Sequence, residues 1–164
     1  MITPEQYRSY FENIAEQNVD LAHSPTHKSF NAINIDDLIN DLNGPAKFPA
    51  MMLEKMSGRI RGVDNGNLFQ FPDAAFTILI QCPDEDYQRE NEIYNQAYAI
   101  GLEIFAFMNE EYQANANTIA RYFEPEKGIS WENVGPVYDN CYGVRFQFSL
   151  ASGVNLKKNP SKWL

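Results

Sequence analysis

The longest regular pattern in the sequence is a stretch at about 84–112 in which apolar side chains recur at helical spacing. Asp84, Glu85 and Asp86 lie at its start, where the helix dipole favours negative charge. Its apolar side chains form one broad face: Tyr87, Ile93, Tyr94, Ala97, Tyr98, Ile100, Gly101, Ile104, Phe105, Phe107 and Met108. A helix with so wide an apolar face has to pack across a sheet, or between a sheet and another subunit. Gly101 costs about 1 kcal/mol against alanine in mid-helix and therefore indicates a close approach of another element.

Alternating apolar and polar residues on both sides of this helix predict a sheet. Residues 74–82 and 142–150 carry the clearest alternation, with one buried and one wet side in the second of them. Further strands are expected at 48–56, 59–63, 118–123 and 129–137. The turn chemistry of residues 64–67 predicts a hairpin. We therefore expect an α+β fold: a mostly antiparallel sheet flanked by one long helix (about 84–112) and by N-terminal helices.

The beginning of the chain predicts a capped helix. Thr3, Pro4 and Gln6 form a capping-box pattern, and the helix is expected to end before Ser24-Pro25. A second short helix is expected at about 35–43. Because the sequence contains no internal repeat and no linker composition, residues 1–164 are expected to form a single domain, with a loosely held basic C-terminal tail from about 153.

Composition is that of a globular protein, with 44% hydrophobic and 21% charged residues among 164. The first residues do not form a secretory signal, and the apolar runs are shorter than a bilayer requires. The two cysteines, Cys82 and Cys141, are too few for a disulfide framework and are expected to be buried thiols in a reducing compartment. We expect a soluble cytoplasmic chain with no membrane partner, free or assembled into a particle.

The net charge of −9 is unevenly placed along the chain. Residues 1–139 hold nine Lys and Arg against 22 Asp and Glu, whereas residues 140–164 hold four basic residues and no acid. An acidic body repels phosphates, so nucleic acid is not expected as the main partner. The basic end offers an unlike patch for a neighbouring chain; a disordered terminus is the alternative. The candidate protein-contact residues are Lys157, Lys158, Lys162 and Trp163.

The histidines and cysteines form no catalytic pattern. His23 and His27 have a spacing that would align them on a helix, but Pro25 lies between them in a turn, so an exposed polar loop is favoured over a metal site. Cys82 ends a strand beside acidic residues, which disfavour a reactive thiolate.

The carboxylates and glycines have structural explanations. The acidic cluster at 84–86 is explained by a helix start, and Glu110-Glu111 by a solvated helix end. Gly58, Gly62 and Gly66 lie in hairpin territory without the strand, loop and helix of a phosphate site. We therefore identify no catalytic, cofactor-binding or metal-ligating residue and expect no cofactor.

The order of elements resembles the tail-terminator and tail-completion proteins of bacteriophages and related tail-like assemblies. The features that carry it are the N-terminal helix, the strand entry Phe48-Pro49-Ala50, a hairpin, a strand ending at Pro83, the long helix, and a closing hairpin with Asp139 and Gly143. The resemblance covers about residues 48–150. It implies an antiparallel sheet flanked by helices that forms rings, usually hexameric, which cap a tail tube. The longer N-terminal region and the basic end ending in Lys162-Trp163-Leu164 depart from the smaller members.

Three classes of function stay open at this point. The first is a structural protein of a prophage tail or tail-like machine, whose partners are copies of itself, in a ring or other homo-oligomer, and other tail proteins. The second is an acidic, monomeric binding or immunity-type inhibitor of a basic partner, because negative charge speeds encounter with such a target. The third is an enzyme with a scattered site, which leaves no motif. The absence of catalytic patterns favours the non-enzymatic classes.

Overall fold

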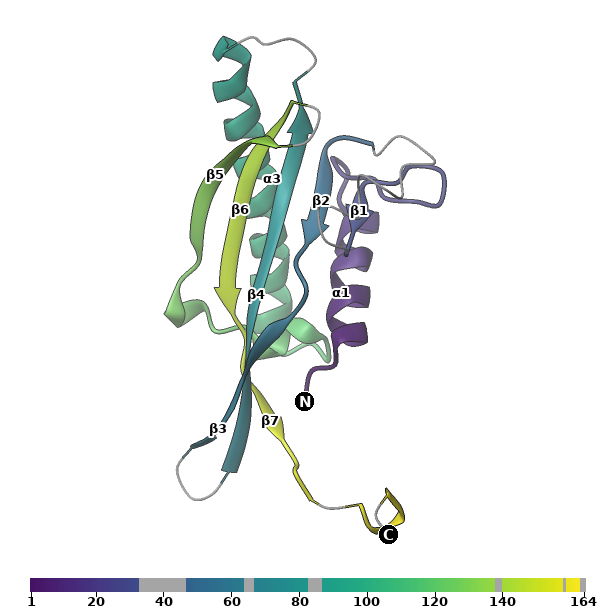
Figure 1. Ribbon diagram of the computed structural model, residues 1–164, viewed down its shortest axis with the longest axis vertical. Coiled ribbons are helices and arrows are strands. Elements are labelled where there is room, and N and C mark those ends of the chain that lie inside the picture. The colour runs from purple at the N-terminus through teal and green to yellow at the C-terminus, as the bar shows by residue number, and fades with distance from the viewer. Residues whose placement is uncertain (33–46, 64–66, 83–86, 138–139, 158, 163–164) are drawn as a thin grey trace.

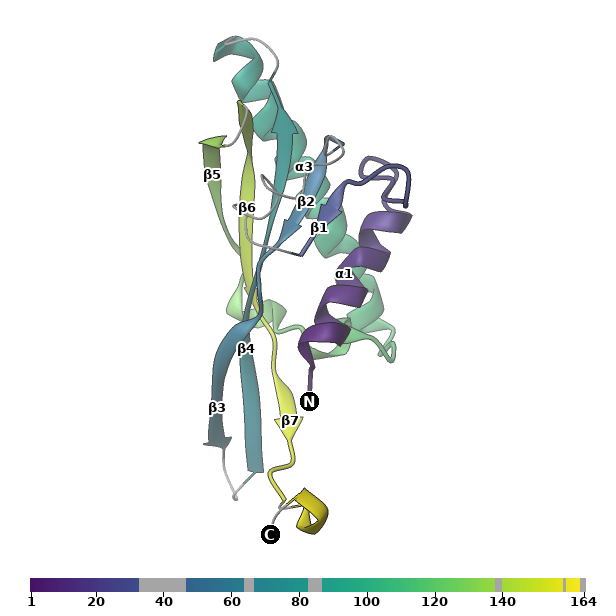
Figure 2. The same cartoon turned by 45° about the vertical axis from the view of Figure 1, so that its right-hand side comes forward.

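The computed structural model describes the chain except for residues 33–46, 64–66, 83–86, 138–139, 158 and 163–164. The described residues form one layer of strands and one layer of helices. The two α-helices among them, α1 (Pro4–Gln17) and α3 (Tyr87–Gln113), lie on the same face of the sheet (Figures 1 and 2). The fold is α+β, as expected from the sequence.

Within the described residues, seven strands form one sheet in the order β1-β2-β4-β6-β5, while β3 and β7 pair with the first part of β4. Their bounds are β1 Phe30–Asn31, β2 Ala50–Leu53, β3 Ser57–Val63, β4 Asn67–Gln81, β5 Ser130–Val137, β6 Cys141–Ser149 and β7 Ser152–Val154. Pairing is antiparallel throughout except between β1 and β2. The strands expected at 129–137 and 142–150 are confirmed.

Helix α1 (Pro4–Gln17) begins with the predicted capping box. The Gln6 backbone N–H donates to Thr3 Oγ1 at 3.1 Å, and the Thr3 N–H donates to Gln6 Oε1 at 3.0 Å. The helix ends at Gln17, earlier than the proline alone predicts, because the Asn18 side chain accepts from the backbone N–H groups of Asp20 and Leu21 and so competes with the helix.

Helix α3 (Tyr87–Gln113) matches the predicted long helix and crosses the sheet against β4 and β6. Gly101 faces β6, and a Cβ atom at this position would overlap the Phe146 ring. The predicted close approach is therefore confirmed, and its partner is an aromatic ring of the central sheet.

An aromatic cluster fills the space between the helices and the sheet. Phe76 of β4 is fully buried, with its ring centroid 5.3 Å from those of Phe105 and Phe146 and 5.9 Å from that of Phe11. These four residues come from α1, β4, α3 and β6, so one cluster joins the main elements. Such rings bury large apolar areas and add about 0.5–1.5 kcal/mol per pair beyond that area.

A second part of the sheet projects from the body (Figure 1). We call it the arm and define it as β3, residues 67–72 of β4, and β7. In the arm β4 pairs with β3 along one edge and with β7 along the other. β4 runs through Pro72 without a break. On the edge of β4 that faces β6 and β7, Phe71 and Pro72 have no partner, so the missing N–H of Pro72 interrupts no pairing on that edge. For this reason β4 runs for 15 residues, rather than over the predicted 74–82 alone.

One predicted strand is wrong. Residues 118–123 do not form a strand, because Ile119–Tyr122 is a 3₁₀ helix, η2. Ile119 and Phe123, four residues apart, are both buried and Arg121 is exposed. A strand would place all three side chains on the same side and would bury the charge.

Two other predictions have different outcomes. The helix predicted at 35–43 lies outside the described residues. The tail predicted from about 153 begins later, because Gly153 and Val154 still pair with β4 in β7. Neither helix in the described ranges combines the length and the apolar character needed to cross a membrane.

We predict that Gly101→Ala destabilises the fold, although alanine is the better helix former. Overpacking a close-packed core costs about 1–3 kcal/mol, and helix propensity returns about 1 kcal/mol of this. Urea unfolding should show a net loss of up to about 2 kcal/mol in the free energy of unfolding. Gly62→Ala is the matched control, since nothing lies within 4 Å of a Cβ atom there. Equal unfolding midpoints for the two variants would contradict the packing described for Gly101.

Candidate protein-contact surfaces

The face of the sheet away from the helices carries an ion cluster centred on Arg145 of β6. Its guanidinium forms a two-point pair with Glu54, Nε to Oε1 at 2.5 Å and Nη2 to Oε2 at 3.0 Å. It also donates from Nη1 to Glu132 Oε1 at 3.2 Å. These carboxylates raise the pKa of Arg145 above its ordinary value, mainly because the guanidinium donates hydrogen bonds to Glu54. The cluster joins the end of β2 to β5 across β4 and β6 and leaves Glu132 63% exposed.

The same face carries a small apolar cluster at the other end of these strands. Met52, Leu79 and Cys141 are buried there, although no helix covers this face. Phe48, Val134 and Val137 pack against them. This face is therefore partly closed by chain segments at the ends of β2 and β5 and is polar around Arg145.

The arm has a cationic and aromatic side that continues the helix-free face. Arg59 lies opposite Phe71 and Arg61 lies opposite Phe69 in the register of β3 and β4. The Arg61 guanidinium carbon is 4.4 Å from the centroid of the Phe71 ring, and Lys127 Nζ is 5.0 Å from the same centroid. A cation held over an aromatic face keeps its charge exposed to a partner while its stem is packed.

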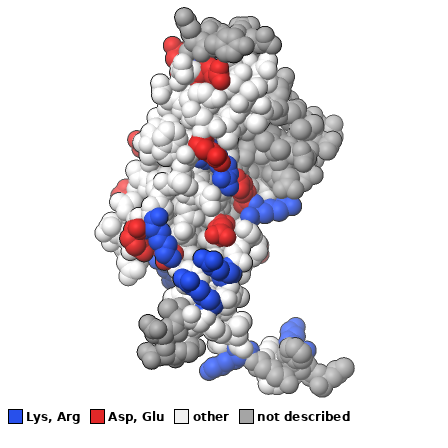
Figure 3. All heavy atoms as spheres, turned by 60° about the vertical axis from the view of Figure 1, so that its left-hand side comes forward, with Lys and Arg blue, Asp and Glu red and all other residues white. Residues whose placement is uncertain are grey.

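The charges divide between the two ends of the molecule. Helices α1 and α3 together carry eight Glu and two Arg, whereas the described residues of the arm carry Arg59 and Arg61 and no acid. Figure 3 shows Lys and Arg gathered towards the arm and the tail. The protein thus presents an acidic helical layer and a basic arm.

Two of the four contact residues predicted from the sequence, Lys157 and Lys162, follow β7 in the described part of the chain. Lys157 and Lys162 are exposed, and in the part of the chain with a described placement neither forms an ion pair with the acidic body. Lys158 and Trp163 are outside the described residues. The structure therefore extends the predicted basic patch by Arg59 and Arg61. Their spacing of two in the strand expected at 59–63 places both arginines on one side, but the acids elsewhere in residues 1–139 outweigh them in the net charge of that part of the chain.

The two histidines have different roles. His27 lies in the predicted turn, where its N–H donates to the Ser24 backbone oxygen at 3.1 Å. His23 is not in an exposed loop, because its side chain is 12% exposed and its Nδ1 accepts from the N–H groups of Ser29 and Phe30, both at 3.2 Å. It therefore joins the segment that follows α1 to the start of β1. Among residues with a described placement, no three His, Cys, Asp or Glu side chains gather as a metal site requires.

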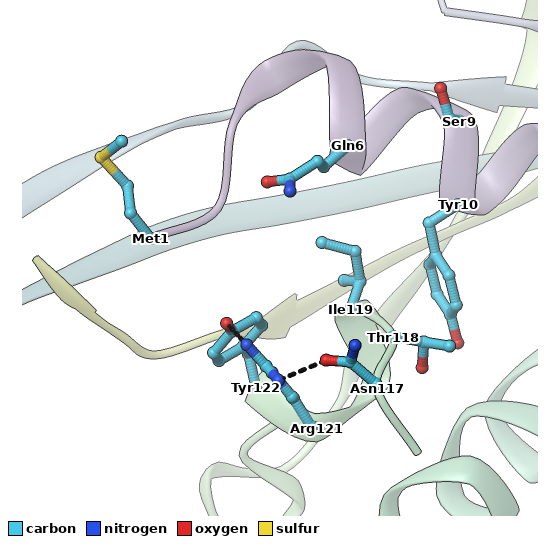
Figure 4. Close-up of a pocket in the computed structure, with 9 residues that line it drawn as sticks. All are labelled: Met1, Gln6, Ser9, Tyr10, Asn117, Thr118, Ile119, Arg121 and Tyr122. Carbon is cyan, nitrogen blue, oxygen red and sulfur yellow. Dashed lines mark hydrogen bonds between the residues drawn. The ribbon is translucent and has the colours of Figure 1, made fainter.

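A pocket of about 390 Å³ lies between α1 and η2 (Figure 4). Arg121 lines it, with Nη1 donating to Asn117 Oδ1 at 2.5 Å and the guanidinium carbon 4.5 Å from the Tyr122 ring centroid. The Tyr10 hydroxyl donates to Glu111 at 2.7 Å, and burial together with that carboxylate raises the pKa of Tyr10 above its ordinary value. Tyr10 is therefore held protonated, and its bond to Glu111 joins α1 to α3, while Arg121 binds residues of its own segment.

Comparisons with known proteins found no match: no protein-family model and no curated protein matches this chain. The function proposed below therefore depends on the surfaces just described and on the order of the elements.

We predict that Arg145→Met lowers the free energy of unfolding by about 1 kcal/mol at low salt, because partly exposed ion pairs contribute about that much at most. The difference should shrink in 1 M NaCl, where the Debye length is about 3 Å. Arg8→Met is the control, since Arg8 is 61% exposed and its single pair with Glu12 spans 3.7 Å. A loss for Arg145→Met no larger than for the control at low salt would show that the cluster does not join the strands.

Proposed function

We propose that this chain is a structural protein that assembles head to tail with copies of itself into a ring, as a component of a prophage tail or tail-like machine, without a cofactor. The observation that carries the proposal is the arm, a basic extension of the sheet on a protein whose helical layer is acidic.

The arm is poorly explained by the stability of a lone chain. β3 has β4 as its only partner among the described strands, β7 adds only three paired residues on the other edge of β4, and so narrow a ribbon has little apolar surface to stabilise it. Ile60 in β3 is 51% exposed, and the cationic side of the arm faces away from the main core. Burying such a ribbon against a second chain would supply the partner that it lacks.

The charge division favours a head-to-tail arrangement over a two-fold one. A two-fold interface brings a patch against its own copy, so arm against arm would oppose Arg59 and Arg61 with the same residues. Arm against acidic body is attractive, and such an interface repeats around a ring if its rotation closes. The tail residues Lys157, Lys158, Lys162 and Trp163 would add contacts at this interface.

The order of elements supports the tail-machine class. The chain runs through a helix, a strand entered from Phe48-Pro49, the β3–β4 hairpin, the long helix α3 and the closing hairpin of β5 and β6. This is the order that the resemblance to tail-terminator proteins rests on, and it places an antiparallel sheet on one side of the helices.

We predict that the double reversal Arg59→Glu with Arg61→Glu disrupts assembly. Size-exclusion chromatography with light scattering should give the unmodified chain a mass that is a whole multiple of 18.8 kDa and the variant a mass of one chain. The control is Arg8→Glu with Arg89→Glu, which changes net charge equally on the acidic helical layer and should assemble as the unmodified chain does.

A monomeric unmodified chain at cellular concentration would contradict the proposal and would favour the acidic inhibitor class. An oligomer that survives the arm reversal as well as it survives the control would show that assembly does not use the arm.

A further inference from the structure

Within the described structure, four strands pair along one edge only, β1, β3, β5 and β7, and β3 and β5 have the longest of these free edges. β5 is the last strand on one side and pairs only with β6, whereas β3 lies on the other side of β4 and pairs only with β4 in the part of the chain that the structure describes. A free edge presents backbone N–H and C=O groups that pair readily with another strand. The two edges face in opposite directions across the sheet, as a head-to-tail repeat requires.

β3 and β5 also each expose one large apolar side chain on the helix side of the sheet. Ile60 is 51% exposed, and it lies opposite Gln70 in the register. Trp131 is 54% exposed, lies opposite Phe146, and has its ring centroid 5.0 Å from that of Tyr98. Alternation along continuous β4 and β6 places Ile60 and Trp131 on the same side of the sheet.

The helix-free side of the two strands carries opposite charges. Arg59 lies opposite Phe71 in β4, and Glu132 lies opposite Arg145 in β6, so both are on the side away from the helices. Glu132 is 63% exposed, and its carboxylate can accept further hydrogen bonds in addition to the one from Arg145. Within the described part of the chain, Arg59 forms no ion pair.

Both edges are regular over at least five residues. The pairing of β5 with β6 is regular from Ser130 to Val134 and shifts between Val134 and Val137, so five residues present a regular edge. β3 pairs regularly with β4 over all seven of its residues. If Ile60 is set opposite Trp131 in an antiparallel pair, Arg59 falls opposite Glu132, and both matches occur in one register.

We propose that the free edge of β3 pairs antiparallel with the free edge of β5 in a second copy of this chain, with Ile60 against Trp131 and Arg59 against Glu132. The inference rests on the head-to-tail assembly proposed above and names its interface. Cross-strand apolar and opposite-charge pairs are what stabilise such a junction, and each copy offers both halves of it. The sheet would thus continue from copy to copy, and in a closed ring neither edge would stay free.

Disulfide capture between two different single variants tests the pairing. Ile60→Cys and Trp131→Cys copies are mixed under mild oxidation, and the product is read by non-reducing gel electrophoresis. Directly opposed strand positions bring Cβ atoms to about 4.5–5.5 Å, close to what a disulfide needs. The native Cys82 and Cys141 are both buried and should contribute little. The mixture should give a dimer at least about tenfold above a control mixture of Val19→Cys with Trp131→Cys, where Val19 is 89% exposed on the helix side of the molecule.

The outcomes separate the two proposals. A monomeric unmodified chain overturns both. An oligomer in which the Ile60→Cys and Trp131→Cys mixture gives no more dimer than the control overturns the strand pairing and leaves the assembly proposal standing. Strong capture by Ile60→Cys alone also overturns it, since that product requires β3 against β3.

Charge reversal gives a second test that needs no new cysteine. Arg59→Glu and Glu132→Lys should each weaken association about tenfold or more, because each replaces an attractive cross-strand pair by a repulsive one. Arg145 retains its pair with Glu54 in the second variant. Mixing the two variants recreates one native junction between unlike copies, so heterodimers should form. A mixture that associates no better than either variant alone would contradict the pairing of Arg59 with Glu132.

Discussion

Phe76 lies at the centre of the contact that decides how this chain is arranged. Its ring meets Phe105 of α3, Phe146 of β6 and Phe11 of α1, and it is inaccessible to solvent. The missing side chain of Gly101 lets α3 approach Phe146 closely enough for these rings to meet. Because all of these rings lie on one side of the sheet, both helices are drawn to that side (Figure 2).

The one-sided core leaves the remaining surfaces open for other chains. The opposite face of the sheet carries the Arg145 cluster, and β3 and β5 each have a free edge within the described structure. The acidic residues of α1 and α3 face the surroundings, while Arg59 and Arg61 lie on the arm. Unlike charges and free edges are thereby placed at separate positions of one molecule, which is the arrangement that head-to-tail assembly uses.

Local patterns in the sequence predicted much of the fold. The capping box at Thr3, the strand at 142–150 and the close approach at Gly101 each depend on residues near in sequence or on a single position, and the structure confirms them. The prediction for 118–123 was wrong because the burial of Ile119 and Phe123 at a spacing of four depends on the tertiary packing of η2.

The candidate interface was less predictable. Because a proline usually ends a central strand, Pro72 gave no indication that β4 continues into the arm. Pro72 is tolerated because it lies between the residues of β4 that pair with β6 and those that pair with β7, and this arrangement depends on the tertiary structure. Arg59 and Glu132 are visible in the sequence, but only the strand pairing shows that they lie on β3 and β5, whose free edges are on opposite sides of the sheet. The basic end of the chain was visible, whereas the arginines of the arm were not distinguished from the acidic body.

Negative-stain electron microscopy of the unmodified chain tests the central claim of closed head-to-tail assembly most directly. The account predicts closed rings of uniform size with a central opening. Isolated elongated particles with the dimensions of one chain, or open filaments of variable length, would contradict it.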